Sequence, residues 1–70
     1  MTIKEYRLEL AWSITELARR AKLASRTVSR IEDGEPAYDH TVAAIANALS
    51  EGLGKRITIN DLDGVNIADR

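Results

Sequence analysis

Five basic side chains in residues 17–31 are the part of this sequence best suited to bind a ligand. Arg19, Arg20, Lys22, Arg26 and Arg30 lie there without any acidic residue, which gives the segment a charge of +5. Residues 1–16 sum to −1 and residues 32–70 to −5, so the whole chain has a net charge of −1. The distribution of charge matters more than its total for attracting a charged partner. The pattern therefore indicates either a surface that binds phosphates or an ordinary solvated face.

Side chains suited to catalysis or metal binding are scarce. His40 is the only histidine and there is no cysteine, so the usual metal cluster or thiol nucleophile cannot be assembled. Asp39 adjoins His40, but neighbours in sequence do not make a catalytic triad, and this pair is typical of a helix start. The four glycines lack the spacing of a phosphate-binding loop. We therefore expect no enzymatic activity, no metal and no cofactor.

The length and composition favour one small folded domain. The chain has 70 residues, of which 44% are hydrophobic and 30% are charged. A chain this short buries only about 60% of its unfolded surface, so dimerisation would strengthen a marginal core. The sequence shows no cysteine, no signal peptide and no apolar run long enough to span a bilayer. We expect a cytoplasmic, nucleoid-associated protein.

Residues 13–34 have the pattern of two short helices joined by a tight turn. Ser13 and Glu16 have the spacing of a capping box at the start of the first helix. Ala24 or Ser25 begins the second helix, and Gly34 suits the positive φ that often follows a helix end. Apolar residues recur at helical spacing on one side of each helix. The buried positions that this predicts are Leu17, Ala18, Ala21, Val28 and Ile31.

The flanking segments predict two further helices. Thr2 and Glu5 repeat the capping-box spacing, so a helix is expected over residues 3–11. A second is expected over residues 41–51, with Gly52 and Gly54 ending it. The buried positions expected for these helices are Ile3, Tyr6, Leu10, Val42, Ile45, Ala46 and Leu49. Trp12 should pack beneath the first two helices of the chain.

The residues after Gly54 allow two interpretations. Thr58 and Asp61 have the spacing to cap a single helical turn that runs through Leu62, with an extended tail after it. Alternatively, residues 57–59 and 65–67 alternate apolar with polar side chains and could form a hairpin that turns at residues 60–64. We favour the turn followed by the tail.

These patterns resemble the phage-repressor and Cro-like helix-turn-helix family, often called XRE-type. The residues that carry the resemblance are Ser13, Glu16, Leu17, Ala18, Thr27, Val28, Ser29, Arg30, Ile31, Glu32 and Gly34. The resemblance implies an all-α fold, a compact four- to five-helix lambda-repressor-like DNA-binding domain with a central helix-turn-helix. It implies that this domain covers residues 1–62 and that residues 63–70 form an extended C-terminal tail.

The resemblance also implies which residues contact DNA. The second helix of the motif, about residues 25–33, enters the major groove in this family, and its first turns face the base edges. By position, the base-contacting candidates are Ser25, Arg26, Ser29 and Arg30. The phosphate-contacting candidates are Ser13, Thr15, Lys22 and Thr27. His40 and Thr41 are further phosphate candidates, although ordinary helix capping explains both.

Other family positions concern stability or depart from the usual pattern. The family often pairs the acid at position 32 with an arginine of the first helix, which here implies an ion pair between Arg7 and Glu32. Lys22 replaces a turn glycine, and Ala24 replaces a serine or threonine cap. The remaining departures, which remove a phosphate contact or add repulsion, are Ile14, Asp33 and Glu35.

The resemblance favours a sequence-specific, double-stranded DNA-binding transcriptional regulator that acts as a homodimer. The C-terminal region would form the dimer, through apolar side chains among Leu53, Ile57, Ile59, Val65 and Ile67. The acidic C-terminal half supports an alternative, a protein-interaction module such as an antitoxin or accessory subunit with secondary DNA binding. In that case a protein partner would occupy the acidic part.

Overall fold

The first helix begins where its capping residues predict and ends earlier. The computed structural model describes residues 1–68, and in it α1 spans Ile3–Glu9. The Glu5 amide donates to Thr2 Oγ1 at 3.1 Å and the Thr2 amide donates to Glu5 Oε1 at 2.7 Å, so the capping box is confirmed. The predicted end at residue 11 is wrong because Ala11 has a φ of 57°, which no right-handed helix accommodates.

The second helix, α2 (Ile14–Ala21), has only half of the predicted capping box. Ser13 Oγ accepts the Glu16 amide at 3.0 Å. The Glu16 carboxylate does not return to the Ser13 backbone, because it accepts hydrogen bonds from Arg19 and Arg20 one turn further on. Lys22 follows the helix with a φ of 60°, the left-handed conformation that a glycine would adopt more easily.

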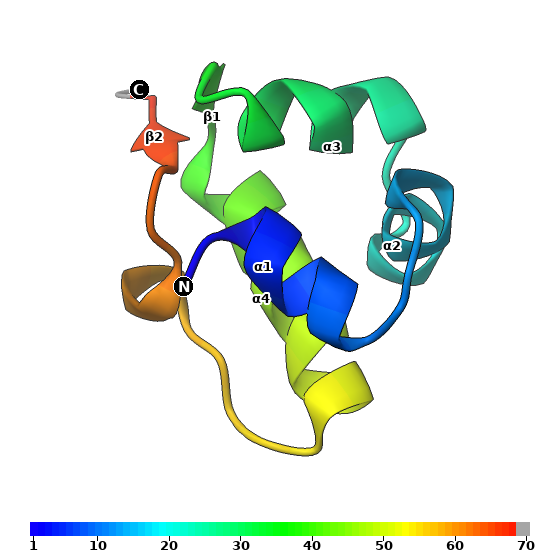
Figure 1. Ribbon diagram of the computed structural model, residues 1–70. Helices are drawn as coiled ribbons and strands as arrows, with labels where there is room; N and C mark the ends of the chain where they lie inside the picture. Colours follow the sequence, from blue (N-terminus) through cyan, green and yellow to red (C-terminus); the bar gives the residue numbers. More distant parts are fainter. Residues whose placement is uncertain (69–70) are drawn as a thin grey trace.

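The third helix, α3, spans Ser25–Glu32, one residue less than predicted. Ala24 is its N-cap and gives it no side-chain hydrogen bond, and Ser25 does not replace that cap. Gly34, with a φ of 88°, follows the helix end as predicted. In Figure 1, α3 lies along the top of the molecule beside α2, at the outer edge of the bundle.

The long helix α4 (Asp39–Leu53) is extended at both ends relative to the prediction. It ends at Gly54, which has a φ of 69°. The prediction that Gly52 ends the helix is wrong, because Gly52 lies inside it. Position 52 needs a glycine for a steric reason. A Cβ on Gly52 would come within 2.5 Å of the Trp12 ring, so the tryptophan packs directly on the helix backbone.

The C-terminal segment forms a helical turn and then pairs with an earlier part of the chain. The turn η1 covers Ile59–Asp61, which confirms the predicted turn, and Asp61 accepts the Thr58 amide at 2.9 Å. The hairpin alternative is wrong, because β2 (Asn66–Ile67) pairs in parallel with β1 (Pro36–Ala37). The predicted tail over residues 63–70 thus includes a short strand, and its last two positions lie outside the described residues.

One core joins all four α-helices to the C-terminal segment. Its largest fully buried side chains are Leu17, Val28, Val42, Ile45 and Leu49. Ile57 and Leu62 are also buried in it. Ile57 was a candidate for the dimer contact, and that expectation is wrong because its side chain is already covered within the subunit. None of the helices in residues 1–68 is both long and apolar enough to cross a membrane.

Candidate nucleic-acid interface

Helix α3 presents one apolar and one polar face, and the core fixes which faces outward. Val28 and Ile31 are 0% and 2% exposed and anchor the inner face. Ser25, Arg26 and Arg30 are exposed, and Ser29 is partly exposed. Residues four apart lie on the same side of a helix, so Ser25 lies above Ser29 and Arg26 above Arg30. The four base-contacting candidates therefore share one outward-facing surface.

Only part of the positive charge on the helix-turn-helix is free to meet an anion. Glu16 accepts a hydrogen bond from Arg19 at 2.5 Å and from Arg20 at 2.6 Å. The Arg20 guanidinium also lies 4.4 Å from the centroid of the Trp12 ring, a cation–π distance. Within residues 1–68, no ion pair engages Lys22, Arg26 or Arg30. The cationic surface is thus centred on the turn and on α3.

The Glu16 carboxyl group stays ionised to a lower pH than a free glutamate does. The hydrogen bond from Arg19, and after it the one from Arg20, lowers the pKa of Glu16 below its ordinary value. A carboxylate with a lowered pKa stays ionised as the pH falls, and its favourable contribution disappears only below that lowered value. Glu16 therefore stays ionised, and able to attract Arg19 and Arg20, throughout the neutral range.

The phosphate-contacting candidates do not form a single cluster. Ser13 and Thr15 are exposed at the start of α2, and the Ser25 hydroxyl donates to Thr15 Oγ1 at 3.5 Å, which links the starts of α2 and α3. Lys22 is exposed in the turn after α2. Thr27 is partly buried and lines a shallow groove of about 200 Å³ together with Arg30.

That groove contains an aromatic residue absent from the predicted contacts. Tyr38, 52% exposed, precedes α4, and its ring stacks on His40 with the centroids 5.8 Å apart and the planes at 8°. The signal available in the sequence was an aromatic residue directly before an expected helix start. The His40 amide donates to Asp39 Oδ1 at 2.7 Å, a local contact at the start of the helix.

An ion pair holds α1 against the end of α3. Arg7 Nε and Nη2 donate to the two Glu32 carboxylate oxygens at 2.8 and 3.1 Å, and Arg7 Nη1 donates to the Trp12 carbonyl at 3.0 Å. The two side chains are only 10% and 8% exposed. This bidentate geometry positions α3 and neutralises the acid nearest its C-terminal end.

Two acidic residues at the end of α3 remain uncompensated. Asp33 and Glu35 are exposed on either side of Gly34, and neither forms an ion pair within residues 1–68. Their negative charges oppose the approach of a phosphate backbone to that end of the helix. The favourable end of α3 is consequently its N-terminal end, where Arg26 lies.

The left-handed backbone at Lys22 gives a stability prediction. Changing Lys22 to glycine should raise the free energy of unfolding by about 0.5–1 kcal/mol, because removing the Cβ strain outweighs the added flexibility of the unfolded chain. Urea denaturation measures the change. Lys22→Ala is the matched control, since it removes the amine but keeps the strain. An equal gain in both variants would trace the effect to charge and contradict the prediction.

Comparison with known proteins adds one finding. A model of the helix-turn-helix family matches residues 3–58, which includes every α-helix described above. No curated protein matches the chain, and no solved structure does.

Proposed function

The chain belongs to the phage-repressor and Cro-like (XRE-type) helix-turn-helix family of DNA-binding regulators, and from this premise we propose that it recognises a specific double-stranded DNA sequence. The family is one of regulatory domains and not of enzymes. The observation that carries the proposal is the outward face of α3, opposite the buried Val28 and Ile31. Arg26 and Arg30 are exposed there and form no ion pair with any residue in positions 1–68.

In the proposed complex, α3 lies in the major groove and its outward face meets the base edges. Arg26 is the main base reader, because arginine can donate two hydrogen bonds to O6 and N7 of a guanine. Arg30 is a second reader or holds a phosphate beside the groove. Ser25 and Ser29 contribute less selective hydrogen bonds.

Phosphate contacts fix the position of α3 on the duplex. Ser13 and Thr15 lie at the N-terminus of α2, where backbone amides and the helix dipole favour an anion. Lys22 adds a positive charge in the turn, and Thr27 adds a hydroxyl on α3. Such contacts set register and affinity but carry no sequence information.

We place two copies of the chain on one operator with two half-sites. A single domain of this size offers one short reading helix, which contacts only a few base pairs. A homodimer doubles the contacts and gives a two-fold symmetric site. The C-terminal part of the chain would supply the subunit contact.

A specific observation favours a second function, that of a protein-interaction module such as an antitoxin or accessory subunit. Asp33 and Glu35 leave uncompensated negative charge beside α3, and Glu16 engages two of the arginines. These charges weaken binding to DNA and suit a basic protein partner.

The salt dependence of DNA binding separates the two functions. If Lys22, Arg26 and Arg30 meet phosphates or bases, log K should fall linearly with log salt, with a slope of about −0.9 for each phosphate neutralised. Changing Lys22 to glutamine should make the slope shallower by about 1 per subunit. Fluorescence anisotropy with a labelled duplex measures both quantities.

Lys55→Gln is the matched control for that titration, because Lys55 follows α4 and its ammonium lies 6.0 Å from the Tyr6 ring, away from α3. The slope should not change in this variant. Absence of binding to any duplex at low salt would contradict the DNA-binding proposal and favour the protein partner.

A further inference from the structure

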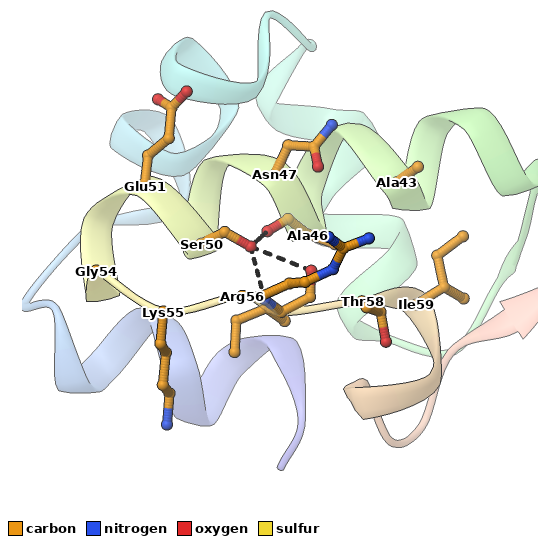
Figure 2. Close-up of a pocket in the computed structure, with 11 residues that line it drawn as sticks. Ala43, Ala46, Asn47, Ser50, Glu51, Gly54, Lys55, Arg56, Thr58 and Ile59 are labelled. Atoms are coloured by element: carbon orange, nitrogen blue, oxygen red, sulfur yellow. Dashed lines mark hydrogen bonds between the residues drawn. The ribbon is translucent and has the colours of Figure 1, made fainter.

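A groove separates α4 from the segment that follows it. It has a volume of about 700 Å³. Figure 2 shows Ala43, Asn47 and Glu51 along its α4 wall and Arg56, Thr58 and Ile59 along the opposite wall. In Figure 1 the segment after α4 runs from the bottom of the molecule up its left side to η1, whereas α3 lies at the top. None of the residues that line the groove belongs to α2, to the turn after it or to α3. The groove is therefore separate from the DNA-binding face.

Hydrogen bonds fix the distance between the two walls. The Ser50 hydroxyl donates to the Ala46 carbonyl at 2.8 Å and accepts the Ile57 amide at 2.8 Å, and it lies 3.1 Å from the Ile57 carbonyl (Figure 2). The groove is consequently preformed. The Ser50 hydroxyl hydrogen is also engaged by backbone carbonyls, so it is not available to donate to a ligand.

One acid and two bases line the groove, namely Glu51, Lys55 and Arg56. The Lys55 ammonium lies 6.0 Å from the Tyr6 ring, so Glu51 and Arg56 are the charges left to meet a partner. Glu51 and Arg56 both line it and are exposed, yet neither forms an ion pair with any residue in the described part of the chain. Arg56 and Lys55 are the only Lys or Arg residues in positions 33–68, which also contain six acidic residues. A partner that matches this rim needs an acid for Arg56 and a base for Glu51.

We propose that a second copy of this chain occupies the groove, with Glu51 of each subunit paired to Arg56 of the other. In a two-fold symmetric contact, if residue i meets residue j, then j meets i, so one acid and one base on the same surface satisfy each other twice. The short side chains of Ala43 and Asn47 let the two α4 helices approach closely. This inference rests on the homodimer of the proposed function and identifies its surface.

The pairing is tested by reversing the charges in the full-length chain. Glu51→Arg and Arg56→Glu should each weaken self-association by on the order of tenfold or more, because each places like charges together at two symmetric positions. The double variant E51R/R56E restores opposite charges and should return the dissociation constant close to that of the unchanged chain. Sedimentation equilibrium measures it, and circular dichroism verifies that each variant is folded.

Two controls separate this surface from the rest of the proposed function. Glu9→Arg makes the same charge change on the exposed side of α1 and should leave self-association unchanged. Binding to a duplex with one half-site should also be unchanged in the groove variants, while cooperative binding to two half-sites is lost in the single variants.

Unchanged self-association in both single variants would contradict the proposal that the groove is the dimer contact, and it would leave the homodimer in place. Failure of the double variant to recover would overturn the Glu51–Arg56 pairing. If the chain without substitutions stays monomeric, both alone and on DNA with two half-sites, the proposed groove contact and the homodimer are both wrong.

Discussion

Changing Arg7 to alanine is expected to lower the free energy of unfolding by about 3–5 kcal/mol, the usual cost of removing one partner from a buried ion pair. The variant leaves the Glu32 carboxylate, 8% exposed, without its two charged hydrogen bonds. It also leaves the Trp12 carbonyl without the Arg7 donor. A domain of this length has little stability to spare, so a loss of this size would unfold much of the protein near 37 °C.

Thermal and urea denaturation measure this effect, and a paired replacement controls for it. The double variant Arg7→Met with Glu32→Leu removes both charges together and should lose less stability than Arg7→Ala alone. At a temperature where all variants are folded, DNA affinity should differ little from that of the unchanged chain. An unchanged melting temperature for Arg7→Ala would show that the ion pair does not stabilise the domain.

Changing Arg26 to alanine is expected to weaken binding to the preferred duplex by about 1–3 kcal/mol, or roughly fivefold to 150-fold. The side chain is exposed on the outward face of α3, one turn before Arg30, and has no ion-pair partner within residues 1–68 to compete with DNA. The variant should also lose its preference at one base pair of each half-site, because a bidentate arginine distinguishes guanine from the other bases.

The control for Arg26 separates base reading from simple attraction. Affinities are measured for the preferred duplex, for duplexes changed at single base pairs and for a random duplex. Lys4→Ala removes from α1 an exposed cation that has no ion-pair partner in the described part of the chain, and it should have little effect on any of them. An equal loss on preferred and random DNA would assign Arg26 to phosphate binding instead.

Local sequence signals predict much of this fold. The capping pair Thr2 and Glu5 sets the start of α1, and the spacing of Val28 and Ile31 predicts the buried side of α3. These signals are reliable because a helix cap or an apolar stripe depends only on residues within one or two helical turns. The Ser13 and Glu16 pair shows their limit, since both Arg19 and Arg20 compete for the same carboxylate.

The features that sequence reasoning missed depend on contacts between distant segments. Two-residue strands have no periodicity, so the pairing of Ala37 with Ile67 has no local signal. Gly52 reads as a helix end, yet the Trp12 ring that lies against it comes from forty residues earlier. The sequence alone suggests that Ile57 is an exposed apolar residue. In the structure, hydrogen bonds between the Ser50 hydroxyl and the Ile57 backbone hold its segment against α4, and its side chain is buried.

The candidate site was predictable to a similar degree. Helical spacing and family position place Ser25, Arg26 and Arg30 on one exposed surface, as the structure has them. The number of basic side chains in residues 17–31 that are left without an ion pair was not predictable, because it depends on which arginine rotamers reach Glu16. Tyr38 was missed because its exposure depends on how β1 leads into α4.

Selection of bound sequences from a pool of random DNA duplexes tests the central claim most directly, since that claim is that the outward face of α3 reads bases. We predict enrichment of one sequence with two inverted half-sites whose centres lie about one helical turn, or a multiple of it, apart. We also predict a guanine at the position where enrichment disappears in Arg26→Ala. No enrichment over the starting pool at low salt would contradict sequence-specific recognition by this chain.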